Sequence, residues 1–287
     1  MSIDLHTHST YSDGTDSPEE LLAKAKERGI EALALTDHDT CRGLARAAQA
    51  AKEHNIIFVR GCELSTMSER GEFHILGLWI PEECPALKIK LRELRRRRDL
   101  RNEQMVERLC AIGLPLTIED VLACVQGNGT VGRPHIAQAM LNKGYVRTTR
   151  EAFDKYIGAG CSAYVPKKVF SPEEAVKALV EVQATICLAH PMLHHYPLHW
   201  LKQRIAKLVD CGLDTIEVWH TEHSLSDIEL CLQWAKEFNI GVSGGSDYHA
   251  KRKPGVELGT GHGNLNIPMS VLDALIARRK AKGLPVF

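Results

Sequence analysis

The sequence lacks an excess of charge of either sign. Its 287 residues include 36 Lys and Arg and 36 Asp and Glu, so the whole molecule has no bulk field that would attract nucleic acid or an anionic membrane. We therefore expect any anion-binding site to be local, and we expect no stable binding of duplex nucleic acid.

Thiolate pairs and long apolar runs are also missing. The nine cysteines are scattered without a Cys-x-x-Cys pair, which argues against a thiolate metal site and against the disulfide framework of a secreted protein. No run approaches the ~20 apolar residues of a membrane span, and the first residues do not show the pattern of a secretion signal. These absences predict a protein of the reducing cytoplasm with no membrane partner. They leave its oligomeric state open.

What is present indicates a globular α/β protein. Strand patterns alternate with helix patterns, and two of the helices are expected to begin at the capping sequences Ser17-Pro18-Glu19-Glu20 and Ser171-Pro172-Glu173-Glu174. This alternation predicts a largely parallel sheet or barrel, whose ligands gather where strands end. The expected strands cover Ile3–His6, Ala32–Thr36, Ile56–Arg60, Phe73–Trp79, Thr185–Ala189, Thr215–Trp219 and Ile240–Ser243.

The alternation is interrupted once. Residues 82–160 read as a long polar helix followed by shorter helices. We predict a barrel domain formed by residues 1–81 and 161–287, with a mainly helical insertion at 82–160 that caps the active site.

Histidines and carboxylates follow the predicted strands. His6-Thr7-His8 places two imidazoles on one side of a strand end, because alternate side chains of a strand share a face. Such nitrogen and oxygen donors suit borderline or hard divalent cations. The sequence therefore predicts a metal site. Its candidate ligands are His6, His8, Asp13, His38, Glu63, His74, His190, Asp247 and His249.

Single residues of this pattern could have a structural role in place of metal binding. Carboxylates after strands often cap helices, and this alternative stays open for Asp37 and Asp39. Lone histidines such as His54 and His262 are typical surface residues. The whole ordered set of His-x-His, Thr-Asp-His, Gly-x-Glu, a strand histidine, His-Pro and Ser-Asp-x-His is much harder to explain structurally.

These ordered motifs resemble the PHP (polymerase and histidinol phosphatase) family, over nearly the whole chain. The resemblance implies a distorted (β/α)7 barrel and a centre of three divalent metals, with manganese expected and iron or zinc as alternatives. It also implies three ligand sets. One metal would be held by His6, His8 and Asp247, with Glu63 bridging to a second that His74 and His190 complete, and Asp13, His38 and His249 would hold the third.

Within the family, the chain resembles most closely the bacterial members that act on nucleoside 3′,5′-bisphosphates and short 5′-phosphorylated RNA. Adjacent divalent ions can activate water for attack on phosphorus and neutralise the developing charge. The leaving alkoxide needs a proton, for which His194 or His223 are the candidates. For His194, a plain polar loop is an equal alternative.

Phosphate recognition is predicted in the insertion. In Gly132-Arg133-Pro134-His135, a guanidinium and helix-end amides could face one anion, and the resemblance gives Arg133 and His135 this role. The alternative is a plain helix start with an exposed arginine. The basic run 88–101 could attract the substrate but could also be a solvated face, with Arg98 and Arg101 expected to reach inward. Lys167 matches a segment that borders the nucleotide pocket in the family.

One departure affects the substrate. Relatives commonly carry an arginine after the His-Pro pair, where this chain has Met192-Leu193-His194-His195. Our first hypothesis is removal of the 3′-phosphate from nucleoside 3′,5′-bisphosphates, with trimming of short RNA from its 5′ end as a possible second activity. The alternatives are a histidinol-phosphate phosphatase, an amidohydrolase and a metal-binding module without turnover.

Overall fold

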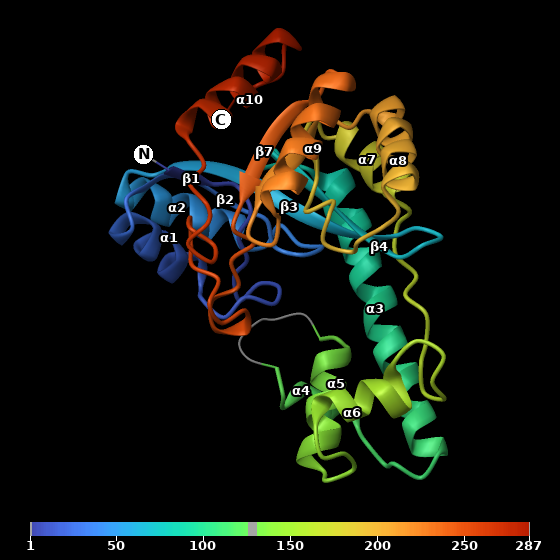
Figure 1. The fold of residues 1–287 in the computed structure, drawn as a ribbon. Coiled ribbons are helices and arrows are strands. Elements are labelled where there is room, and N and C mark those ends of the chain that lie inside the picture. The colour runs from blue at the N-terminus through green and yellow to red at the C-terminus, as the bar shows by residue number, and fades with distance from the viewer. Residues whose placement is uncertain (1, 126–130, 287) are drawn as a thin grey trace. The chain divides into compact units, whose positions relative to one another are not determined.

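The computed structural model describes residues 2–125 and 131–286 (Figure 1). It divides the chain into two compact units. The chain up to Lys88 and from Phe170 onward forms the first, and Ile89–Val169 forms the second. The sequence analysis placed the insertion at 82–160, and its role as a cap on the active site stays a prediction.

The first unit is built on a seven-stranded sheet in which the strands follow their order along the chain. β1 to β3 are parallel to one another, as are β5 to β7, whereas β4 is antiparallel to both of its neighbours. The strands are β1 (Ser2–Asp4), β2 (Ile30–Leu35), β3 (Ile57–Met67), β4 (Glu72–Leu78), β5 (Thr185–Leu188), β6 (Thr215–His220) and β7 (Gly241–Gly245).

Backbone hydrogen bonds join the first strand to the last. The amide of Leu5 donates to the carbonyl of Gly244 at 3.2 Å, and the amide of Asp247 donates to the carbonyl of His6 at 2.9 Å. The sheet is thereby a nearly closed barrel, and the predicted distorted (β/α)7 fold is confirmed.

The antiparallel β4 is the feature that the sequence analysis did not anticipate. β3 runs on through Glu63 to Met67, and a turn of four residues, 68–71, leads directly into β4. A connection this short cannot cross over to a parallel strand, which needs a dozen or more residues. As a result Glu63 and His74 lie inside paired strands, and Glu63 is not a residue after a strand end.

Helices pack against the strands of this unit (Figure 1). Ser17 and Ser171 accept from the backbone of Glu20 and Glu174 in complete capping boxes, as the repeated capping sequences predict. The helices are α1 (Pro18–Glu27), α2 (Leu44–His54), α7 (Pro172–Val180), α8 (Leu198–Cys211), α9 (Leu225–Glu237) and α10 (Met269–Ala281).

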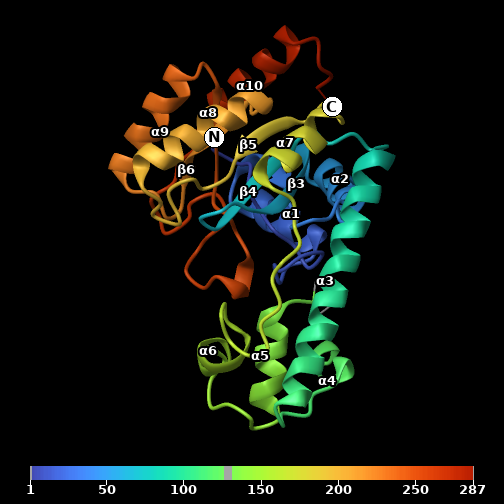
Figure 2. The same ribbon diagram turned by 90° about the vertical axis from the view of Figure 1, so that its right-hand side faces the viewer.

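The second unit is helical, as Figure 2 shows for the segments it contains. Its core is an apolar cluster that includes Met105, Leu109, Ile136 and Met140. Its elements are most of α3 (Pro85–Ala111), together with α4 (Ile118–Leu122), α5 (Arg133–Asn142), α6 (Thr149–Ala152) and the π-helix Phe153–Ile157. Among residues 2–125 and 131–286, no helix is long and apolar enough to cross a bilayer.

Candidate metal centre

The nine predicted metal ligands lie together in the first unit. In each of four groups, one potential ligand atom from every member lies within 4.8 Å of the others. Most of the nine follow strands β1, β2, β5 and β7, whereas Glu63 and His74 extend from β3 and β4. The groups are His8, Asp13, His38 and His249; His6, Glu63 and His190; His6, His8 and Asp247; and His38, Glu63 and His74.

Glu63 is the centre of this cluster. Its carboxylate is fully buried, and its two oxygens face different imidazoles. Oε1 lies 3.0 Å from His74 Nδ1 and 3.3 Å from His190 Nε2. Oε2 lies 3.3 Å from His6 Nε2, 3.2 Å from His8 Nε2 and 3.1 Å from His38 Nδ1. A carboxylate that reaches two sets of imidazoles can bridge two cations.

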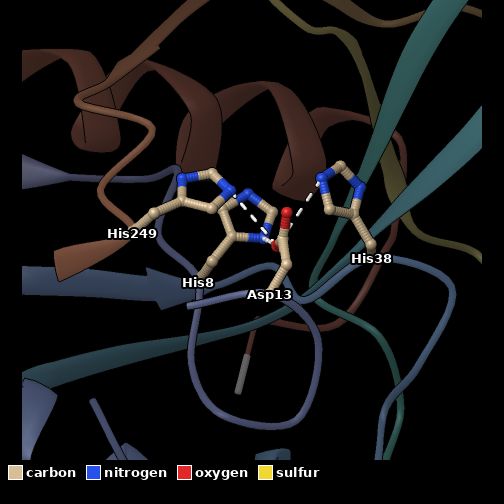
Figure 3. A group of neighbouring side chains, drawn as sticks. All are labelled: His8, Asp13, His38 and His249. Atoms are coloured by element: carbon tan, nitrogen blue, oxygen red, sulfur yellow. Dashed lines mark ion pairs between the residues drawn. The ribbon is translucent and has the colours of Figure 1, made fainter. Parts of the chain in front are cut away.

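Asp13 gathers a second set of rings. Its Oδ1 lies 3.2 Å from His249 Nε2, 3.8 Å from His8 Nδ1 and 3.9 Å from His38 Nε2. Figure 3 shows these three imidazoles around the Asp13 carboxylate. The side chain of Asp13 is 39% exposed, whereas those of His8 and His249 are buried. This group therefore lies on the accessible side of the cluster.

Hydrogen bonds to the outer ring nitrogens orient three of the imidazoles. Nδ1 of His6 lies 3.0 Å from Glu217 Oε1, Nδ1 of His8 lies 3.4 Å from Ser12 Oγ, and Nδ1 of His249 lies 2.7 Å from the carbonyl of Asp247. Each partner can accept a proton from Nδ1, which leaves the Nε2 lone pair directed into the cluster. Metal-bound histidines commonly have such outer partners.

A second observation indicates that the candidate ligand atoms could hold a cation. Nε2 of His6 and His8, Nδ1 of His38 and Oε2 of Glu63 are buried and close together, but among the described residues none of them is in a hydrogen bond of normal geometry. Buried polar atoms are normally paired, because an unpaired one costs about 1–3 kcal/mol. Imidazole nitrogens and a carboxylate oxygen that converge without aligned hydrogen bonds between them are what a divalent cation would satisfy.

The pKa values of the histidines in the cluster are shifted in opposite directions. Burial lowers the pKa of His38 to about 3 and that of His190 to about 4. Burial also acts to lower the pKa of His8 and His74, but neighbouring carboxylates outweigh it and raise their pKa values to about 9 and about 10. Burial acts to raise the pKa of Glu63, but neighbouring imidazoles, first that of His38 and then that of His74, hold it well below its usual range. The carboxylate is therefore ionised at neutral pH.

Two of the predicted ligands lie at positions of unusual backbone geometry. His190 has a φ of 26° and Asp247 a φ of 55°, both in the left-handed region that residues other than glycine rarely adopt. Strain of this kind persists only where the surroundings enforce it, and it is concentrated at functional sites. At His190 the enforcing contact is a hydrogen bond of 2.7 Å from its amide to Glu217 Oε2.

Three residues that contact this cluster were missed by the sequence analysis. Glu217 bonds His6 and His190, while His220 Nε2 and Lys253 Nζ both lie within hydrogen-bond distance of Asp247 Oδ2, at 3.4 Å and 2.5 Å. The amide of Glu222 donates to His220 Nδ1, so Nε2 carries the proton toward Asp247. A carboxylate inside the apolar strand β6 and a histidine at its end were the available signals.

The two candidate proton donors differ in their surroundings. His194 is exposed on the loop after β5, with its ring 5.5 Å from that of Tyr196. His223 is buried, and its Nδ1 donates to the carbonyl of Val218 at 2.8 Å. Burial lowers the pKa of both histidines. A neutral His223 presents a lone pair at Nε2 and no proton there, so its role as an acid stays a prediction.

The predicted substrate-binding residues all lie in the second unit. The guanidinium of Arg133, at the first position of α5, lies 5.5 Å from the centre of the Phe153 ring and 5.7 Å from that of Tyr164. His135 is buried, and its Nδ1 accepts from the amide of Gly132 at 3.1 Å. The guanidinium of Arg133 thus lies close to two aromatic rings, and His135 stabilises the start of its helix.

The other basic candidates in this unit are less uniform. Arg101 reaches inward as predicted, since it is 6% exposed and its Nε donates to the carbonyl of Val165 at 2.7 Å. Arg98 and Lys167 are half-buried. Substrate contacts by these three residues stay predictions.

Comparisons with known proteins agree with the site. The sequence model of the PHP domain family matches residues 4–83 of this chain. A 3′,5′-nucleoside bisphosphate phosphatase of Chromobacterium violaceum is 34% identical, over 90% of this chain and 90% of its own length. A 5′-3′ exoribonuclease of Haemophilus influenzae is 32% identical, over 86% and 89%. A phosphoribosyl 1,2-cyclic phosphate 1,2-diphosphodiesterase of Eggerthella lenta is 34% identical, over 88% and 95%.

A solved structure shares the whole architecture. It is a candidate metal-dependent phosphoesterase from Bifidobacterium adolescentis, 30% identical, with a TM-score of 0.81 over 96% of this chain and 95% of that one. Barrel, cluster and relatives together define a metal-dependent phosphoesterase. The chain belongs to the PHP family.

Proposed function

We propose that this protein is a phosphoric monoester hydrolase that removes the 3′-phosphate from nucleoside 3′,5′-bisphosphates and also trims short RNA from its 5′ end. The observation that carries the proposal is the cluster of nine donors around Glu63 and Asp13. The names of the relatives from Chromobacterium violaceum and Haemophilus influenzae support the choice of substrate. We place the reaction in the cytoplasm.

The cluster would hold three divalent ions, with manganese as the expected metal and iron or zinc as alternatives. His6, His8 and Asp247 form one group, and Asp13, His38 and His249 form another with His8. Glu63 belongs to two further groups, one with His6 and His190 and one with His38 and His74. Bound there, the ions would act as Lewis acids toward water and toward the phosphoryl oxygens. Mixed imidazole and carboxylate donors are compatible with each of the three metals.

The residues of the chain would do the remaining work. Glu217, Ser12 and the carbonyl of Asp247 keep Nε2 of three histidines directed into the cluster. Arg133 would bind the second phosphate of a bisphosphate, because a guanidinium can form two parallel hydrogen bonds to phosphate oxygens. His194 or His223 would donate the proton that the leaving alkoxide needs.

A second candidate is a phosphodiesterase that opens a cyclic phosphate of a phosphorylated ribose. The relative from Eggerthella lenta, as similar in sequence as the bisphosphate phosphatase, carries that name. The residues after His190-Pro191 favour this alternative, since Met192, Leu193 and His194 offer no guanidinium there. A diester carries less charge than a monoester and needs a weaker anion clamp.

The test is a kinetic comparison with manganese supplied. Adenosine 3′,5′-bisphosphate, a short 5′-phosphorylated RNA, phosphoribosyl 1,2-cyclic phosphate and histidinol phosphate are compared, with an amide panel for the amidohydrolase alternative. The proposal expects the highest kcat/KM for the bisphosphate. Turnover of histidinol phosphate or of the cyclic phosphate, with none of the bisphosphate, would replace it, and no turnover at all would favour a metal-binding module.

Arg133→Ala provides a second test of the substrate. If Arg133 binds one phosphate of the bisphosphate, its loss should raise KM about 10- to 100-fold, the range expected for a hydrogen bond to a charged group. KM for a substrate with a single phosphate should change much less. Arg150→Ala, an exposed arginine in the same unit, is the matched control. Equal effects of both variants on KM would exclude a specific contact by Arg133.

A further inference from the structure

A lysine in the loop after β7, Lys253, contacts the metal cluster. Lys253 follows the short 3-10 turn Ala250–Arg252, and its Nζ lies 2.5 Å from Asp247 Oδ2. The lysine side chain is 41% exposed, whereas that of Asp247 is 5% exposed. The ammonium therefore extends from the accessible side of the barrel to a carboxylate at its centre.

Asp247 divides its two oxygens between the cluster and its outer partners. Oδ1 faces His6 Nε2 at 3.5 Å and His8 Nε2 at 3.3 Å, while Oδ2 faces His220 and Lys253. Since His220 already donates to Oδ2, the orientation of the carboxylate does not depend on the lysine alone. Lys253 adds positive charge next to the cluster without occupying the oxygen that faces His6 and His8.

The ammonium has donors to spare. A lysine ammonium carries three N–H groups, and among the described residues Asp247 is the partner that accepts from Lys253. An ordinary lysine is already a cation at neutral pH. The side chain is 41% exposed, so N–H groups are available on its exposed side.

The neighbouring basic residues show that this placement is particular to Lys253. Arg252 donates from Nε to the backbone carbonyl of Asp13 at 2.9 Å and so fastens the loop. Lys251 is exposed, and its backbone amide donates to Thr15 Oγ1 at 3.0 Å. Of these three cations, Lys253 is the one whose charged group contacts a side-chain carboxylate of the metal cluster, since Arg252 reaches only the backbone of Asp13.

We propose that Lys253 binds the substrate, by contacting a phosphoryl oxygen of the ester held at the cluster. A phosphate ester brings negative oxygens to the accessible side of the site, and an ammonium on that side can neutralise one of them and donate a hydrogen bond. The inference rests on the proposed phosphoesterase function. It is independent of whether the substrate is a bisphosphate, an RNA or a cyclic diester.

The test compares Lys253→Met, which keeps the length of the apolar stem and removes the ammonium, with Lys253→Arg and with the matched control Lys251→Met. For each protein, bound manganese per chain is counted, the Kd for inorganic phosphate is measured by calorimetry, and kcat and KM are determined with adenosine 3′,5′-bisphosphate and with p-nitrophenyl phosphate. The phosphate titration reports on binding without turnover.

The proposal expects Lys253→Met to weaken phosphate binding and raise KM by about 10-fold or more, as for a lost charged hydrogen bond, with the bound metal unchanged. Lys253→Arg should recover part of the loss, and Lys251→Met should match the wild type. A Lys253→Met variant with reduced metal but unaltered phosphate affinity once saturated would show that the lysine only supports Asp247, and would overturn the proposal.

The same measurements distinguish a failure of the proposed phosphoesterase function from a failure of the role proposed for Lys253. If the manganese-loaded wild type neither binds phosphate nor hydrolyses any phosphate ester, both proposals fall together. If the wild type hydrolyses phosphate esters and Lys253→Met does so with the same KM and phosphate Kd, the phosphoesterase function stands and only the role of Lys253 is excluded.

Discussion

Glu217 offers the sharpest test of how the cluster is held together. Its buried carboxylate accepts from His6 Nδ1 at 3.0 Å and from the amide of His190 at 2.7 Å. The first bond keeps Nε2 of His6 free for a cation, and the second holds His190 at its left-handed φ of 26°. One side chain thus positions a predicted ligand on each side of Glu63.

Glu217→Gln keeps the shape of the side chain and removes one of its two acceptors. A glutamine has a single carbonyl oxygen, so it cannot accept from both His6 and His190. Its NH₂ group must face either the ring nitrogen or the backbone amide. If it faces His6, Nδ1 has to accept, and the ring proton moves to Nε2, where it blocks the metal. If it faces His190, the bond that maintains the backbone is lost.

The expected effect is a weaker metal site. Loss of an outer partner of a metal-binding histidine typically lowers affinity by about 10- to 100-fold, or about 1.4–2.7 kcal/mol. Because Glu217 contacts two predicted ligands, we expect the upper part of that range. The assay is equilibrium dialysis against buffered free manganese, with metal and protein counted in the same sample, and circular dichroism to verify the fold.

A matched control lies at the start of the same strand. Asp214 directly precedes β6, and its Oδ2 accepts from the amide of Ile186 in β5 at 3.0 Å, while its Oδ1 pairs with Lys282. In the described part of the chain, these hydrogen bonds do not reach a member of the metal cluster. Asp214→Asn should therefore bind manganese as the wild type does. If Glu217→Gln also retains wild-type affinity for every metal, the reasoning that hydrogen bonds to outer ring nitrogens set the metal site is refuted.

Two further predictions concern the cluster itself. Asp13→Asn should release the metal held with His8, His38 and His249 and lower kcat by about 100-fold. The control Asp154→Asn, at an exposed residue of the second unit, should change neither the metal content nor kcat. Unchanged metal content in Asp13→Asn would exclude Asp13 as a ligand. Without metal, His8 and His74 are protonated at neutral pH because their pKa values are raised to about 9 and about 10, so binding must displace protons. Manganese affinity should therefore rise between about pH 6 and about pH 8, by up to about tenfold per pH unit for each proton released, and an affinity independent of pH would contradict this.

That the predicted metal ligands lie together could be expected from the sequence, because their positions depend on local patterns. In a βα barrel, residues that follow a strand lie at the same end as those that follow its neighbours. His6, His38, His190 and Asp247 each follow a short apolar run, so their convergence requires only that the strands form one barrel. The capping sequences at Ser17 and Ser171 are local in the same way, and both helices begin where predicted.

The tertiary structure decided the features that depend on contacts across the barrel. The reversal of β4 follows from a short turn whose geometry a strand pattern does not reveal, and it brings His74 to Glu63 from an antiparallel neighbour. Glu217 is separated from His6 by 211 residues, and only closure of the barrel shows that it bonds the outer nitrogen of that ring.

The contact of Lys253 with Asp247, in the loop after β7, also could not be predicted from the sequence pattern. Three basic residues in a row read as a solvated stretch, and nothing in their order distinguishes the one whose ammonium reaches Asp247. The sequence by itself determined the chemical class of the site, because donor types and strand ends are encoded locally. The orientation of each ring and the cation beside the cluster were decided only by tertiary packing, because they depend on which distant side chains meet inside the barrel.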